Sequence, residues 1–98
     1  MIKGFVAYDL ALQLYQQCEG IQAKHYVKDQ LERAALSIAL NLAEGSGKPS
    51  LAEQRRFYGI ALGSMRETQA LLQILKAQES QQLAHRLGGM IYRLVHPG

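Results

Sequence analysis

Apolar side chains recur every three or four residues along most of the chain, and this spacing limits the fold more than any other feature. No segment alternates apolar and polar residues for long, as a half-buried strand would. The spacing predicts helices over about 6–19, 26–44, 50–77 and 80–95. Short connections between four such helices are typical of an antiparallel up-down four-helix bundle. We therefore expect an all-α fold that forms one domain over residues 1–98.

The segment AEGSGKPS, residues 43–50, has the look of a phosphate-binding loop. A Walker-type loop needs a glycine five residues before the Gly-Lys pair, and a serine or threonine directly after it. Here a leucine and a proline stand at those two positions. We expect instead that one helix stops here and the next one starts. Gly45 would form a left-handed C-terminal cap, and Ser50 and Glu53 would form a capping box.

The junction between the third and fourth predicted helices carries a much weaker signal. Its sequence, KAQESQQ, contains neither glycine nor proline, and only Ser80 suggests the start of a helix. A continuous helix through this segment would be unusually long for a small globular domain. We therefore expect a break here, with Ser80 as the cap.

Composition narrows the class of protein. Hydrophobic residues make up 48% of the chain and charged residues 19%, as in a globular domain. No apolar run approaches the roughly 20 residues that a membrane-spanning helix needs. The N-terminus has no signal-peptide cleavage site, and the single cysteine, Cys18, excludes an internal disulfide bond. We expect a cytoplasmic protein that does not associate with membranes.

The chain offers little for catalysis or metal binding. Its three histidines are far apart, and none has a metal-ligating partner three or four residues away. The Glu-x-x-His motif of di-iron bundles does not occur. Cys18 has no histidine nearby in the sequence, and Glu44 and Glu67 would need a pocket to act as an acid–base pair. We expect no catalytic residue, no metal site and no cofactor.

A seam of polar residues follows the second and third predicted helices. On the second helix these residues are spaced by four, four and three, so they share one face. It consists of Arg33, Ser37, Asn41, Glu44, Arg56, Ser64 and Glu67. One interpretation is a solvated helix face. The other is a buried hydrogen-bonded network, in which Arg33 pairs with Glu67 or Glu44 across helices because an unpaired buried charge is costly. We favour the network, with a role in packing specificity or subunit register.

The second and third predicted helices are apolar on more sides than one bundle can cover. On the second helix Leu31, Ile38 and Leu42 already form a core stripe, yet Leu36 and Leu40 add apolar surface on another side. A helix in a single-chain bundle needs only one apolar stripe. We therefore expect a homo-oligomer.

Basic residues are distributed unevenly along the chain. Residues 50–98 hold six of the eleven Lys and Arg residues but only three of the eight acidic ones. Four arginines in this half have no apparent internal role: Arg55, Arg66, Arg86 and Arg93. They are candidates for contacts with nucleic-acid phosphates, which fix position without reading bases. The alternative is that they only keep an apolar protein soluble.

Residues 31–75 carry an ordered set of short motifs. They are Arg33-Ala34, Ser37-Ile38, Asn41-Leu42-Ala43-Glu44-Gly45, Phe57 through Ala61, and Gly63-Ser64 followed by Glu67. In this order they resemble the family of 23S rRNA intervening-sequence proteins. The resemblance implies a bacterial, non-enzymatic protein that forms pentameric rings of antiparallel four-helix subunits. A related branch comprises the accessory proteins of diversity-generating retroelements, which work with a reverse transcriptase and bind nucleic acid.

Two functions follow from the residues and the resemblance together. The first is a non-catalytic homopentamer that binds ribosomal RNA or another nucleic acid. The second is a protein-interaction scaffold that recruits an enzyme, such as a reverse transcriptase, and contacts nucleic acid weakly. Salt-dependent RNA binding favours the first function, and binding that is insensitive to the loss of basic residues favours the second.

Overall fold

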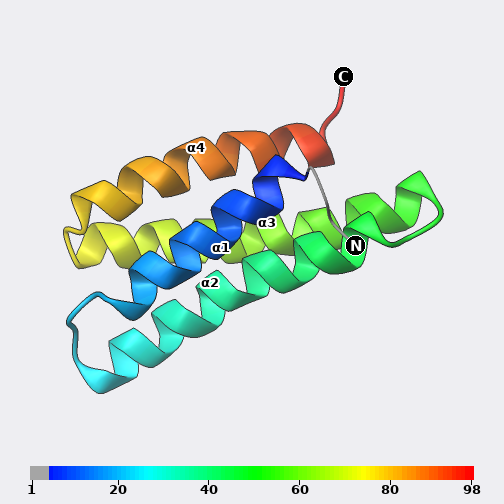
Figure 1. The fold of residues 1–98 in the computed structure, drawn as a ribbon. Helices are drawn as coiled ribbons and strands as arrows, with labels where there is room; N and C mark the ends of the chain where they lie inside the picture. Colours follow the sequence, from blue (N-terminus) through cyan, green and yellow to red (C-terminus); the bar gives the residue numbers. More distant parts are fainter. Residues whose placement is uncertain (1–4) are drawn as a thin grey trace.

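The computed structural model describes residues 5–98, which form four α-helices packed against each other (Figure 1). The helices are α1 (Val6–Glu19), α2 (His25–Ser46), α3 (Leu51–Ile74) and α4 (Gln78–Val95). The described residues contain no strand, so the predicted all-α class is confirmed. The bounds of α1 are those that the spacing predicts.

Each helix packs against two others, and the four helices together enclose one core. Helices α1 and α3 each contact both α2 and α4. The centre of the core takes a large side chain from every helix, among them Leu14, Ile38, Met65 and Leu87, all of which are fully buried. In the described part of the chain, no helix has the length and apolar character that crossing a membrane would require.

The expectation that Gly45 forms a left-handed C-terminal cap is wrong. It lies inside α2, which continues to Ser46, and the cap at Gly47 has a right-handed φ of −91°. A Cβ atom on Gly45 would lie 2.7 Å from Cε1 of Tyr58 and 3.2 Å from Cβ of Phe57. The glycine is therefore required by the close approach of α2 to α3, and the chain turns only after it.

The start of α3 agrees with the predicted capping box. The Glu53 amide donates to Oγ of Ser50 at 3.2 Å. The Ser50 hydroxyl in turn lies 3.2 Å from Oε1 of Glu53, so the carboxylate contacts the hydroxyl group. The first of these bonds satisfies one backbone donor that the first turn of a helix leaves without an intrahelical partner. The second joins the two side chains, so the Glu53 carboxylate accepts from the Ser50 hydroxyl and not, as in a full capping box, from the Ser50 amide.

The expected break between the third and fourth helices is confirmed, but it lies at residues 75–77, earlier than the spacing predicts. Helix α3 ends at Ile74, and Lys76 adopts a left-handed conformation with φ of 57°. The Lys76 amide donates to the Gln73 carbonyl and the Ala77 amide to the Leu72 carbonyl, both at 3.1 Å. This is the Schellman arrangement, with lysine where glycine is usual.

The expectation that Ser80 caps the fourth helix is wrong. Helix α4 begins at Gln78, and Ser80 is buried one turn inside the bundle. Its hydroxyl donates to Oε1 of Gln17 on α1 at 2.8 Å. The serine therefore joins α4 to α1, and no side chain caps the start of α4.

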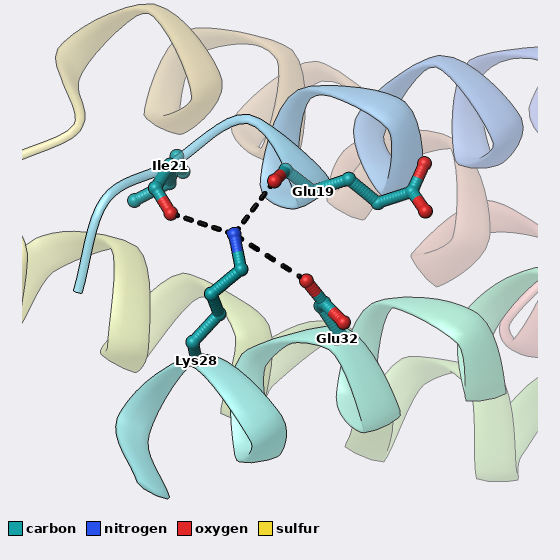
Figure 2. A network of polar contacts seen from close by, with 4 residues as sticks. All are labelled: Glu19, Ile21, Lys28 and Glu32. Atoms are coloured by element: carbon teal, nitrogen blue, oxygen red, sulfur yellow. Dashed lines mark hydrogen bonds and ion pairs between the residues drawn. The ribbon is translucent and has the colours of Figure 1, made fainter. Parts of the chain in front are cut away.

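Lys28 holds the connection between α1 and α2 (Figure 2). Its ammonium group donates to the backbone carbonyls of Glu19 and Ile21, at 2.6 and 2.9 Å, and lies 3.5 Å from the Glu32 carboxylate. A cation is favoured at the C-terminal end of a helix, where carbonyl groups lack intrahelical partners. Lys28 thus caps α1 from the neighbouring helix.

The role of Gly45 can be tested against a second helical glycine. We expect Gly45→Ala to destabilise the protein by about 1–3 kcal/mol, because the added methyl group collides with the buried Tyr58 ring. A Cβ on Gly59 would meet nothing within 4 Å, so Gly59→Ala should stabilise by about 0.5–1 kcal/mol. Urea unfolding of both variants measures the difference, and a Gly45→Ala protein as stable as the parent would contradict the assignment.

Candidate functional site

Half of the polar seam forms a hydrogen-bonded cluster between α2 and α3. The hydroxyl groups of Ser37 and Ser64 lie 2.8 Å apart across the two helices. Asn41 donates its amide N–H groups to the Ser37 carbonyl at 2.8 Å and to the Ser37 hydroxyl at 3.1 Å. On α3, the buried Thr68 hydroxyl donates to the Ser64 carbonyl at 2.8 Å. These partly buried residues form the network that the sequence pattern suggests.

The other half of the seam is exposed, and the expected pairing of Arg33 is wrong. Arg33 pairs with Asp29 on the same helix at 3.1 Å, and its side chain is 80% exposed. Glu44 pairs at 3.0 Å with Lys48, which lies in the connection just after the end of α2. The physical reason is proximity, because an opposite charge four residues away is within reach without crossing to another helix.

The remaining charged seam residues lie on α3. Arg56 places its guanidinium carbon 5.4 Å from the centre of the Phe57 ring, and Lys48 places its ammonium nitrogen 5.1 Å from the same ring. Both are cation–π contacts that cover an otherwise half-exposed aromatic side chain. Glu67 is exposed, and within residues 5–98 it takes no part in an ion pair.

An apolar ridge lies on the outer side of α2 and α3. We define it by four side chains that are 41%, 58%, 44% and 70% exposed: Leu36, Leu40, Ile60 and Ile74 respectively. Leu36 and Leu40 are one helical turn apart, on a side of α2 away from the core stripe. The exposed Gly63 lies on α3 three residues after Ile60. Exposed apolar side chains that gather on one side of a fold are candidates for an interaction site.

The four candidate arginines are exposed, but they divide between two places. Arg66 lines a groove between α3 and α4, and Arg55 lies three turns earlier on the same side of α3. Arg93 lines a different pocket, formed with the start of α1 by Phe5, Val6 and others. Arg86 lies two turns before Arg93 on α4. The structure therefore does not gather the four into a single cluster.

The groove between α3 and α4 was not anticipated from the sequence. It has two adjoining hollows of about 300 and 240 Å³, which share Gln69 and His85. Its lining residues come from positions far apart in the sequence: Leu62, Arg66, Gln69, Gln73, Gln81, His85, Gly88, Gly89 and Tyr92. We call it the glutamine groove. Only the contact between α3 and α4 brings these residues together, so periodicity within one helix gives no signal for them.

The chemistry of Cys18 supports a packing role. The side chain is fully buried in the core cluster. Burial, together with the Glu32 carboxylate and against the effect of Lys28, raises the pKa of the thiol to about 11. The thiol is therefore protonated at neutral pH, whereas a nucleophilic cysteine must reach the thiolate form. Within residues 5–98, no three His, Cys, Asp or Glu side chains gather as metal ligands would.

The fold and its surfaces define a small all-helical bundle whose polar and apolar surface features lie along the helix pairs α2–α3 and α3–α4. Comparison with protein families identifies it further. The chain belongs to the 23S rRNA-intervening sequence protein family, whose model matches residues 6–84. Comparison with curated proteins and with solved structures gave no significant match.

The two halves of the seam should respond differently to mutation. We expect Ser64→Ala to cost about 1 kcal/mol of unfolding free energy, because it removes one of the two side-chain partners of the half-buried Ser37 hydroxyl and leaves only Asn41. Glu44→Ala breaks only a surface pair between residues four apart and should cost at most about 0.5 kcal/mol. Denaturant unfolding at one protein concentration compares them, and a larger cost for Glu44→Ala would contradict this division of the seam.

Proposed function

We propose that the chain is a non-catalytic module of the intervening-sequence type that assembles into a ring and binds RNA or DNA. Its subunit would be an antiparallel up-down bundle, and five copies would form the ring, as the family resemblance suggests. The apolar ridge would be the contact between copies. The buried, protonated thiol of Cys18 supports a role without nucleophilic catalysis.

One observation carries the nucleic-acid part of the proposal: the arginines of α3 and α4 are not neutralised by acidic partners. Within residues 5–98, every ion pair lies on α2 or joins it to the connection that follows it, and each links residues four apart. Arg55, Arg66, Arg86 and Arg93 have no carboxylate within 4 Å and are all exposed. Guanidinium groups in this state are suited to phosphate oxygens.

Assembly would give these arginines a function that one copy lacks. A single subunit offers only a few arginines, divided between two places, and each contact is weak at physiological salt. A ring repeats both places once per subunit, so a long nucleic acid engages neighbouring copies at a high effective concentration. Structured ribosomal RNA is therefore the first probe to use, because the family name associates its members with 23S rRNA.

A protein-interaction scaffold is the second candidate, and the apolar ridge favours it equally. In this case a different protein, such as a reverse transcriptase, would cover Leu40 and Ile60 in place of a second copy. The two candidates differ in what the purified protein does alone. A ring forms without a partner, whereas a scaffold of this kind stays monomeric until its partner is added.

A bacterial cytoplasmic location is part of the proposal. The single cysteine is a free, buried thiol, which suits a reducing compartment. A cytoplasmic protein would also have direct access to ribosomal RNA.

If the apolar ridge is the contact between copies, a charged side chain placed on it should weaken the assembly. We expect the parent protein to be oligomeric by light scattering, and Leu40→Glu to lower its mass, because a buried carboxylate without a partner is costly. Leu51→Glu is the matched control, since Leu51 is 68% exposed at the start of α3 and is not part of the ridge. A parent protein that is monomeric at micromolar concentration would contradict the proposed ring and favour the scaffold function.

The arginines predict salt-dependent binding. We expect the affinity for structured RNA to fall as salt rises, and Arg55→Ala combined with Arg66→Ala to weaken binding by at least about tenfold and to reduce the salt dependence. Lys24→Ala combined with Lys76→Gly removes the same charge at the helix connections and is the control. Fluorescence anisotropy measures the affinities, while light scattering checks that the assembly is unchanged.

Two results would contradict this function. The first is no binding of RNA or duplex DNA at low salt. The second is equal weakening by the arginine and lysine pairs, which would show that net charge alone governs binding rather than the position of the arginines.

A further inference from the structure

The glutamine groove has a lining that differs from the rest of the surface. Three glutamine side chains, Gln69, Gln73 and Gln81, lie together with His85 at one end, and Arg66 and Tyr92 lie toward the other. None of the lining residues is acidic. The groove thus combines primary amides, an imidazole, a guanidinium group and an aromatic ring, without a carboxylate that would repel phosphate.

Hydrogen bonds hold two of these amides in place. Nε2 of Gln81 donates to the Leu72 carbonyl at 3.2 Å, and Nε2 of Gln69 donates to the Ala84 carbonyl at 3.4 Å. Each glutamine therefore spans from one helix of the pair to the other. Within residues 5–98 no donor reaches their Oε1 atoms, so both amides keep an acceptor for a ligand.

Two consecutive glycines keep the α4 side of the groove open. A Cβ on Gly88 would lie 3.1 Å from Nε2 of Gln69, so the glycine leaves room for that amide against α4. At Gly89 the closest atom to an added Cβ would be Nη1 of Arg93, at 3.7 Å. A methyl group at Gly89 would therefore fit without collision, and because Gly89 lines the hollow, we expect a larger side chain to extend into it.

We propose that the glutamine groove binds unpaired bases of a single-stranded nucleic acid, an inference that rests on the proposed nucleic-acid function and specifies its substrate. The amides and His85 contact base edges, which a single strand can turn outward and a duplex keeps inside its stack. Tyr92 is 49% exposed, and its ring centre lies 4.6 Å from that of His96, so the remaining exposed part of the ring is the surface for stacking. Arg66 contacts the adjoining phosphate.

The size and shape of the groove agree with such a ligand. Its two hollows are at or below the lower end of the range for small-molecule pockets, roughly 300–1,000 Å³. Each is suited to a compact planar group such as a base, and the two adjoin along the helix pair as successive bases do along a strand. The apolar ridge lies on a different side of α3, so assembly through the ridge leaves the groove open.

The experiment compares three ligands with the full-length protein: a short single-stranded RNA of mixed sequence, an abasic strand of the same length, and a duplex of that sequence. The abasic strand retains the phosphates but has no bases. We expect the parent protein to bind the single-stranded RNA roughly tenfold more tightly than the abasic strand, because each stacked base contributes to affinity. The duplex should bind with an affinity close to that of the abasic strand.

Gly89→Leu is the variant that closes the groove. A leucine inside a helix is favoured over glycine, so this protein should melt at the same or a higher temperature than the parent. It should lose the preference for bases over the abasic strand and retain the binding that phosphates provide. Gln82→Leu adds the same side chain to an exposed position of α4 outside the groove and should keep the preference.

The outcomes separate this inference from the function on which it rests. Equal affinity for all three ligands would contradict base binding in the groove, and so would a base preference that survives in Gly89→Leu. Either result would still be consistent with contacts between the arginines and phosphates. No binding of any ligand at low salt would contradict the proposed nucleic-acid function and, with it, the binding of bases in the groove. Base preference in the parent and in Gln82→Leu, but not in Gly89→Leu, is the supporting result.

Discussion

The close approach of α2 to α3 is the constraint on which the rest of the molecule depends. Gly45 allows the Tyr58 ring to lie against the α2 backbone, and the Ser37–Ser64 hydrogen bond ties the same two helices further along. Because α2 and α3 are held together in this way, the packing determines which sides of α3 remain at the surface. One side carries the apolar ridge beside α2, and the other forms the glutamine groove with α4.

Charge follows the same division. Charges on α2 are paired with residues four apart, through Asp29–Arg33 on the helix and through Glu44 with Lys48 just after its end. These pairs are at the surface and contribute little to stability, yet they leave the rim of the apolar ridge close to neutral. The arginines of α3 and α4 have no such partners. The apolar ridge and the arginines thus lie on different parts of the bundle, so the proposed contact between copies would leave the arginines accessible.

The sequence predicted the elements well and the contacts between them less well. Spacing identified four helices and the bounds of α1, because a buried stripe is a property of one helix. It misread Gly45, since a glycine near a helix end looks the same whether it caps the helix or admits a neighbouring ring. Lysine gives no signal for a left-handed turn at Lys76. Arg33 has candidate partners on two helices, and the glutamine groove exists only once α3 and α4 lie side by side.

Methyl NMR with a soluble paramagnetic probe tests the central proposal, that the ridge is the contact between copies of the chain, most directly. In a free subunit Leu40, Ile60 and Leu51 are all well exposed, so the probe would broaden all three. If copies assemble through the ridge, the methyl signals of Leu40 and Ile60 are protected and those of Leu51 still broaden. Equal broadening of all three in the native protein would contradict the account.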